Sequence, residues 1–286
     1  MRVRDAVEAM VKEFVMRTFL AASASLALLL GVSVSAAAAD ECPGNPDAIG
    51  TSRTLTVKPR DFPMVGKEQY NETLRLKPRE VVLTFDDGPV PPYTNKVLEA
   101  LAAECAKATF FALGMNVAEA PDLVRRMVKE GHTVGTHTFS HESLIEMSHE
   151  AAMKEIDKGI EVANEALGDR SLLAPFFRAP FLDITTQIQR ELYARGIMIW
   201  SIDVESDDWT DITEEQMVQR VMERLAKVGK GIILMHDIQP LTARALPMLL
   251  AELKRQNYKI VHVVPAPPAA AKSSSLAPAA GATRRN

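Results

Sequence analysis

The chain has 286 residues, 47% of them hydrophobic, and a formal net charge of −4. This length suffices for one large domain or two small ones, and the apolar content is ordinary for a globular protein. The mildly acidic balance gives no support for a nucleic-acid partner or for a surface that binds polyanions.

An export signal is predicted at the N-terminus. From Met16 the sequence has a basic residue, Arg17, then a mainly apolar stretch over 19–34, and then alanines that end at Ala39. We therefore assign residues 1–39 to a signal peptide and predict that translation truly starts at Met16. We expect an exported protein, either periplasmic or secreted. The alternative is an uncleaved membrane anchor. The apolar run is short for a membrane span, so we expect no stable membrane insertion after cleavage.

The regions that flank the central domain carry no pattern of a second domain. Residues 40–78 are polar and contain prolines, and we expect them to wrap the domain surface as an extension. Residues 265–286 are rich in Pro, Ala and Ser, which predicts a disordered tail. After export, Cys42 and Cys105 would meet an oxidising compartment, where they either form a disulfide or remain unpaired thiols.

Between residues 79 and 264, short apolar runs alternate with helical patterns. The seven predicted strands are residues 81–85, 108–112, 132–135, 176–178, 197–202, 231–235 and 260–264. Helices are predicted between and after these strands. Their starts are Thr94 as a cap, Pro121 in a first turn, Ser148 as a cap, Thr213 with Gln216 as a capping box, and Thr242.

The predicted strands are apolar throughout rather than alternating. Runs of this kind, separated by helices, indicate parallel strands that are buried on both faces. Seven such units favour an α/β barrel over the alternative, an open doubly wound sheet. Because no Gly-x-Gly-x-x-Gly motif follows the first strand, nucleotide binding has no support.

Polar residues follow the ends of five predicted strands. They are Asp86 and Asp87, His137 and His141, Arg178, residues 203–209, and His236 with Asp237. In a β/α barrel the carboxyl ends of the strands meet around one mouth, where active sites lie. We therefore expect these five clusters to converge on one cleft.

The first two clusters predict a metal site. One carboxylate of the Asp86-Asp87 pair, together with His137 and His141, makes a three-ligand set with open positions, as in hydrolytic metal sites. Adjacent residues on an extended chain point in different directions, so the other carboxylate can face the substrate. Two histidines four residues apart are often incidental, and the acidic pair is what favours metal binding here.

Five motifs occur in order along the central region. They are Thr-Phe-Asp-Asp-Gly-Pro at 84–89, His-x-x-x-His at 137–141, Arg-Ala-Pro-Phe at 178–181, Asp-Trp at 208–209 and Leu-Met-His at 234–236. Over about residues 79–264 the chain therefore resembles the polysaccharide deacetylases of carbohydrate esterase family 4, the NodB-homology group. The resemblance implies a distorted (β/α)7 barrel of parallel strands and an acetylated glycan as substrate.

The resemblance also implies a role for each residue of the motifs. Asp86 would be the general base, oriented by Arg178, and His236 the general acid, supported by Asp208. One divalent metal, usually zinc with cobalt as an alternative, would be held by Asp87, His137 and His141. Substrate binding would use the backbone N–H of Phe181 and the pocket walls Trp209 and Leu234.

Several residues depart from the family pattern or leave alternatives open. Glu142 follows His141 where the family often has Pro, and Phe181 stands where Tyr is common. Neither change removes an essential functional group. Asp207 could replace Asp208 as the partner of His236, although the spacing to Trp209 favours Asp208. No function is assigned to His132, His149 or His262.

The leading hypothesis is a metal-dependent hydrolase that removes N-acetyl groups from glycans containing N-acetylglucosamine, such as chitooligosaccharide or peptidoglycan, and releases acetate. The alternative among enzymes is an O-acetyl esterase acting on xylan or a related glycan. The alternative of another class is a catalytically silent glycan-binding module. Asp86, Arg178 and His236 disfavour such a module, because a binding protein needs neither a base nor an acid.

Overall fold

The computed structural model describes residues 42–267. The predicted signal peptide, residues 1–39, and residues 268–286 of the predicted tail lie outside the described residues. Within 42–267, no helix combines the length and the apolar character that a membrane span requires.

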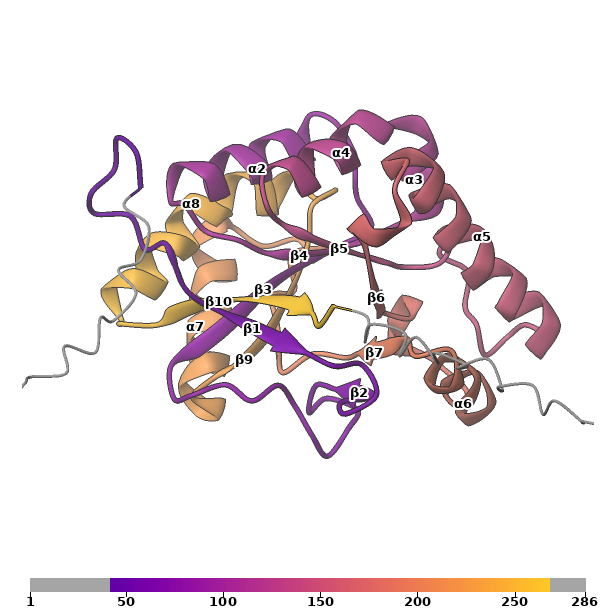
Figure 1. Ribbon diagram of the computed structural model, residues 1–286. Coiled ribbons are helices and arrows are strands. Elements are labelled where there is room, and N and C mark those ends of the chain that lie inside the picture. Colours follow the sequence, from indigo (N-terminus) through magenta and orange to yellow (C-terminus); the bar gives the residue numbers. More distant parts are fainter. Residues whose placement is uncertain (1–41, 268–286) are drawn as a thin grey trace, which may run out of the picture. The chain divides into compact units, whose positions relative to one another are not determined.

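The described residues form one sheet in which every pair of neighbouring strands is parallel (Figure 1). The strand order is β1-β10-β3-β4-β5-β6-β7-β2, with β9 beside β3 and β8 beside β9. The strands are β1 (Thr51–Val57), β2 (Met64–Val65), β3 (Glu80–Asp86), β4 (Thr109–Ala112), β5 (Thr133–Thr136), β6 (Leu173–Phe177), β7 (Met198–Trp200), β8 (Val204–Glu205), β9 (Gly231–His236) and β10 (Lys259–Pro265).

Helices cover the outside of this sheet (Figure 1). They are α2 (Tyr93–Ala103), α3 (Gly114–Glu119), α4 (Pro121–Lys129), α5 (His149–Leu167), α6 (Thr186–Ala194), α7 (Glu214–Val228) and α8 (Pro240–Arg255). The alternation of strands and helices from β3 onward confirms the predicted parallel α/β class. Helices α3 and α6 are additions to the helices expected from the sequence.

The hydrogen-bonded ladder does not close into a complete ring. β7 pairs with β6 and β8 pairs with β9, whereas residues 201–203 separate β7 from β8 without a pairing between them. The chain itself therefore crosses from one side of this gap to the other. β10, which was expected to be the seventh barrel strand, pairs with β3 at only two positions and with β1 along its length.

Both faces of β3 are buried, which explains its continuous apolar sequence. Val81, Leu83 and Phe85 pack in the layer beneath the helices, together with side chains of α2, α7 and α8. Val82 points to the opposite face of the sheet, into a second hydrophobic cluster that contains Phe111 and Trp200. Burial of each such side chain contributes about 1.5–3 kcal/mol to folding.

Most predicted helix starts are confirmed. The Ser148 side chain accepts a hydrogen bond from the Ala151 N–H at the start of α5, and Thr213 with Gln216 forms the predicted capping box of α7. Two starts differ: α8 begins at Pro240, ahead of Thr242, and Thr94 lies inside α2 rather than at its cap. The Thr94 hydroxyl instead accepts from the Val90 N–H and donates to Asp237.

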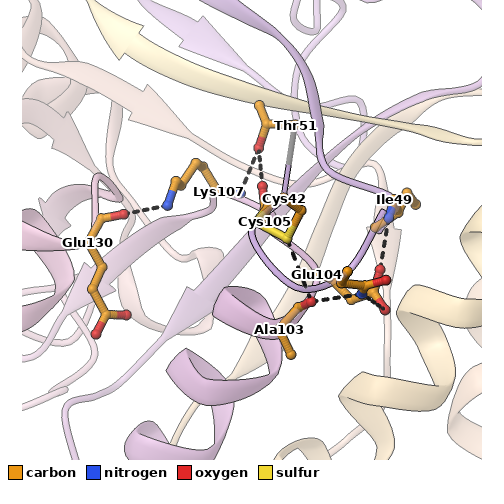
Figure 2. Close-up of a disulfide and its surroundings, with 9 residues drawn as sticks. Cys42, Ile49, Thr51, Ala103, Glu104, Cys105, Lys107 and Glu130 are labelled. Atoms are coloured by element: carbon orange, nitrogen blue, oxygen red, sulfur yellow. Dashed lines mark hydrogen bonds between the residues drawn. A yellow bond between two sulfur atoms is a disulfide. The ribbon is translucent and has the colours of Figure 1, made fainter. Parts of the chain in front are cut away.

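The two cysteines form a disulfide, Cys42–Cys105, which joins the start of the described chain to the loop after α2 (Figure 2). Hydrogen bonds surround this link: the Ile49 N–H donates to Glu104 over 2.8 Å, and the Lys107 N–H donates to the Thr51 hydroxyl over 2.8 Å. The disulfide closes a loop with a sequence separation of 63. In the chain-entropy account a loop of this length contributes about 4 kcal/mol to stability.

The extension before residue 79 contributes two strands that were not expected from its sequence. β1 pairs with β10, and its residues are alternately exposed and partly buried, as is typical of an edge strand. The following residues are held at Asp203, whose carboxylate accepts from the Lys67 N–H and the Thr73 hydroxyl. The extension is therefore part of the sheet as well as of its surface.

Candidate active site

Asp86 and Asp87 lie at the end of β3 and point in different directions. Asp86 is the last residue of the strand and is buried, whereas Asp87 has a left-handed backbone with φ of 75°. The turn is held by Asp237, whose carboxylate accepts a hydrogen bond from the Gly88 N–H over 3.1 Å. A Cβ at Gly88 would lie 2.0 Å from this carboxylate, so only glycine fits there.

His137 and His141 follow β5 and face the Asp87 carboxylate. The Nε2 atom of each histidine lies 3.3 Å from Asp87 Oδ1, and one ligand atom from each of the three residues lies within 4.8 Å of the others. The carbonyl oxygen of Arg178 is 2.7 Å from His137 Nδ1. Because a carbonyl only accepts, Nδ1 carries the proton and the Nε2 lone pair of His137 is available to a cation.

This cluster fits a divalent cation. Asp87 Oδ1 is buried and has no hydrogen-bond partner among the described residues, which is costly unless a cation or water contacts it. Burial by itself raises the pKa of Asp87, but the adjacent His137 lowers it, to about 2, so the carboxylate is ionised at neutral pH. Two imidazole nitrogens and one carboxylate oxygen are a donor set that suits zinc and similar metals.

The loop that carries both histidines is shaped by α5. The Glu155 carboxylate accepts hydrogen bonds from the backbone N–H groups of Phe139 and Ser140 and from the Ser140 hydroxyl. One turn further along α5, a Cβ at Gly159 would lie 2.4 Å from the Thr138 carbonyl oxygen. Sequence reasoning missed both residues, although a glycine inside a predicted helix is a signal of close backbone approach.

Asp86 is paired with a buried arginine. Arg178 Nη1 donates to Asp86 Oδ1 over 2.6 Å and lies 2.9 Å from the Thr84 hydroxyl, while Nη2 donates to the Ser201 carbonyl. The guanidinium also lies over the Phe111 ring, 4.2 Å from its centroid. These contacts leave Asp86 Oδ2 as the oxygen on the side of the Asp87, His137 and His141 cluster, 3.9 Å from His137 Nε2.

His236, on the neighbouring strand β9, is supported by Asp208. Asp208 Oδ1 lies 2.7 Å from His236 Nδ1, and Oδ2 accepts from the His236 backbone N–H over 2.6 Å and from the Thr242 hydroxyl. Asp207 turns away and binds Arg220 and Arg224. Of the two candidate aspartates, it is therefore Asp208 that contacts the histidine.

This environment keeps the His236 ring protonated. Burial by itself lowers the pKa of His236, but its hydrogen bond to Asp208 and the negative charge of that carboxylate outweigh burial and raise the pKa to about 9. The proton on Nδ1 is held by Asp208, so the Nε2 proton is the one that remains for another acceptor.

The predicted residues surround a cavity of about 400 Å³. Its lining includes eight of them: Asp86, Asp87, His137, His141, Phe181, Trp209, Leu234 and His236. Arg178 and Asp208 lie fully buried behind the lining, in contact with Asp86 and His236. The lining also includes Glu205, which was named from the sequence only as part of the cluster 203–209, and Gln239, which was not named.

Two exposed aromatic side chains flank the cavity. The Phe181 ring packs edge-on against His141, with ring centroids 4.7 Å apart, and the Trp209 ring packs edge-on against His236 at 5.3 Å. Phe181 and Leu182 both have left-handed backbones, with φ of 55° and 62°. Exposed rings beside a polar cleft are suited to the apolar faces of sugars.

The remaining singled-out residues lie away from the cavity. His132 accepts from the Ala108 N–H, His262 contacts the Thr133 hydroxyl, and His149 contacts Glu191 between α5 and α6. Burial lowers the pKa of His132 to about 3 and that of His262 to about 4, so both are neutral at physiological pH. Glu142 is exposed and is absent from the cavity lining.

Comparisons with known proteins agree with this arrangement. Residues 74–200 match the family described as polysaccharide deacetylase. Over 193 residues the chain is 35% identical to the peptidoglycan-N-acetylmuramic acid deacetylase PdaC of Bacillus subtilis. This match covers 67% of this chain and 39% of that protein. The chain therefore spans about two fifths of the length of this relative.

Two further relatives are matched over more of their own length. A peptidoglycan-N-acetylglucosamine deacetylase of Bacillus cereus is 35% identical over 188 residues, which cover 64% of this chain and 85% of that protein. Among solved structures, the peptidoglycan deacetylase of Bdellovibrio bacteriovorus has a TM-score of 0.68 at 31% identity, and the match covers 76% of this chain and 59% of that chain.

Proposed function

Because the chain belongs to the polysaccharide deacetylase family, carbohydrate esterase family 4, we propose that it is a metal-dependent hydrolase that removes N-acetyl groups from a glycan and releases acetate. The relatives named as peptidoglycan deacetylases favour peptidoglycan over chitooligosaccharide as the glycan. We assign the reaction to residues 79–264. The proposed export signal, residues 1–39, would deliver the enzyme to the periplasm or to the outside of the cell, where peptidoglycan lies.

One observation carries this proposal: the buried carboxylate of Asp86 and the protonated ring of His236 line the same cavity as the Asp87, His137 and His141 cluster. A divalent cation, zinc or cobalt, held by these three residues would act as a Lewis acid toward the acetamide and its attacking water. A binding module has no use for such an arrangement of base and acid.

Asp86 would act as the general base. Its Oδ1 is occupied by Arg178, so Oδ2 would accept the proton of the attacking water. Arg178 fixes the orientation of this carboxylate because its guanidinium is itself held by Thr84 and Ser201. The backbone N–H of Phe181 would donate to the developing oxyanion, an interaction that typically contributes about 2.7–4 kcal/mol.

His236 would act as the general acid. An amide nitrogen is a very poor leaving group as an anion, so it must receive a proton as the C–N bond breaks. The Nε2–H of His236 is available for that transfer while Asp208 holds Nδ1. Trp209 and Leu234 would wall the space that takes the acetyl methyl group.

The test is acetate release by the metal-loaded protein from a panel of glycans. Peptidoglycan, chitooligosaccharide and acetylxylan are each incubated with protein supplied with zinc or cobalt, and Asp86→Asn is run in parallel. Release from the first two substrates, lost in Asp86→Asn, supports the proposal. Release from acetylxylan alone would instead favour an O-acetyl esterase, and binding of glycans without any acetate release would favour a silent module.

A further inference from the structure

Glu205 places an additional carboxylate in the wall of the cavity. It is the last residue of β8, where it is paired with Leu234 of β9. It is half-buried and lines the same cavity as the metal-ligating cluster, Trp209 and His236. None of the five family motifs includes this position.

The charge of Glu205 has no partner within residues 42–267. No hydrogen bond or ion pair reaches its carboxylate; Arg224 donates to the Glu205 main-chain oxygen over 2.6 Å, and its guanidinium forms the ion pair with Asp207. By contrast, Asp86 is paired with Arg178 and Asp208 with His236. Partial burial and the nearby Asp207 raise the pKa of Glu205, and the more weakly opposing charges of Arg224 and His236 do not cancel this effect.

Peptidoglycan offers two N-acetylated sugars that differ in charge. N-acetylglucosamine is neutral, whereas N-acetylmuramic acid carries a lactyl group on O3, at the ring carbon next to the one that bears the acetamide. The lactyl carboxyl is a free anion in peptide-free strands and is amide-linked to the peptide elsewhere. A sugar whose acetamide sits at the metal-ligating cluster must therefore place its O3 substituent close to the cavity wall. A negative charge in that wall does not repel the first sugar, whereas it repels the second when its lactyl carboxylate is free.

We propose that Glu205 is a specificity-determining residue that repels an anionic O3 substituent, so that the site takes neutral N-acetylglucosamine units in preference to N-acetylmuramic acid. This inference rests on the proposed deacetylase function and deepens it by naming the sugar. At a separation of roughly 7 Å, Coulomb's law gives a discrimination of about threefold in a water-like dielectric and about fiftyfold in that of a protein surface.

The experiment tests charge by combining an uncharged substrate with a nearly isosteric, uncharged variant of Glu205. A peptide-free N-acetylglucosamine–N-acetylmuramic acid tetrasaccharide is compared with the same tetrasaccharide whose lactyl carboxylates are methyl esters. Acetate released from muramic acid units is measured at pH 8 as kcat/KM. In the wild type, kcat/KM for the ester is expected to exceed kcat/KM for the free acid by at least about threefold. In Glu205→Gln the ratio of these two values should be close to one. The exposed Glu223 of α7 supplies the matched control, Glu223→Gln, which should leave the ratio unchanged.

A second measurement separates this inference from the proposed function. The affinities of the metal-loaded Asp86→Asn protein and of the Asp86→Asn, Glu205→Gln double variant for the acid and the ester are measured by calorimetry, which requires no turnover. If no substrate releases acetate, the proposed function fails, and the acid-to-ester affinity ratio still decides the role of Glu205. An identical ratio in the two proteins, or no binding of either glycan, overturns the inference.

Discussion

Asp86 and His236 are register partners on the neighbouring strands β3 and β9. The parallel ladder between these strands therefore fixes the separation of the proposed base and the proposed acid, and no flexible loop intervenes. Each is bound to a separate buried group, Asp86 to Arg178 and His236 to Asp208. The two groups can consequently be altered one at a time, which makes their roles open to independent tests.

The Asp86→Asn variant should lose acetate release and keep its metal. An amide cannot accept the proton of water, so we expect kcat to fall by about 10²–10⁴-fold, the usual contribution of a general base. Metal content is measured by elemental analysis after dialysis. The matched variant is Asp87→Asn, which removes the proposed ligand carboxylate at the next residue and should lose the metal together with activity. A metal-free Asp86→Asn protein would reverse the two assignments.

The value of kcat/KM should fall at alkaline pH, with a midpoint near the pKa of His236. Asp208 raises the pKa of the His236 ring to about 9. A general acid works only while it is protonated, so activity should fall as pH rises through about 9. Asp208→Asn removes the charge that raises this pKa and should move the alkaline limb to lower pH.

Asp207→Asn is the control for this shift. Asp207 is adjacent in sequence but binds Arg220 and Arg224, so its replacement should leave the alkaline limb in place. The same linkage affects folding: the raised pKa stabilises the protein below about pH 6.5, and this contribution should disappear between about 6.5 and 9. An alkaline limb that moves equally in both variants would contradict the role of Asp208.

Substitution of Gly159 by alanine should destabilise the protein, even though alanine favours a helix by about 1 kcal/mol. The new Cβ would lie 2.4 Å from the Thr138 carbonyl oxygen, so the loop that carries His137 and His141 must shift. We expect metal affinity to fall about tenfold or more, as when groups that orient ligands are disturbed. Titration with a zinc chelator measures it, with Glu161→Ala on the exposed face of α5 as the control.

Removal of the Cys42–Cys105 disulfide should lower stability without altering the chemistry. The double variant Cys42→Ser, Cys105→Ser is expected to lose about 4 kcal/mol of unfolding free energy, measured by urea titration. Cys105 precedes β4, whereas Asp87, His137 and His141 follow the carboxyl ends of β3 and β5, and neither cysteine lines the cavity. A comparable kcat in the folded double variant is therefore expected, and a loss of metal would show that the link also supports the site.

The convergence of the polar residues on one cavity was more predictable from the sequence than the edges of the sheet were. Asp86, His137 and His236 could be placed at one cavity, and Arg178 behind Asp86, because polar residues at the ends of apolar parallel strands must meet at one edge. The strand β1 was missed because its alternating polar pattern depends on β10, its partner far along the chain.

Supporting residues were missed for a different reason. Glu155 binds backbone N–H groups of a loop that precedes its helix, and no local pattern distinguishes it from a solvated glutamate on a helix surface. Asp237 was named together with His236, but its contact with the Gly88 turn spans 149 positions and was not predicted. Such contacts are set by tertiary packing, so composition and periodicity carry no record of them.

Arg178 should be required for stability only while Asp86 is charged. Arg178→Met removes a fully buried cation and leaves the Asp86 carboxylate without its partner, which typically costs about 3–5 kcal/mol. The double variant Asp86→Asn, Arg178→Met leaves no buried charge at this pair and should recover much of that loss. Urea titration of the metal-free proteins gives the coupling between the two positions. Additive losses would mean that Arg178 supports the fold through Thr84, Ser201 and Phe111 rather than by compensating the base.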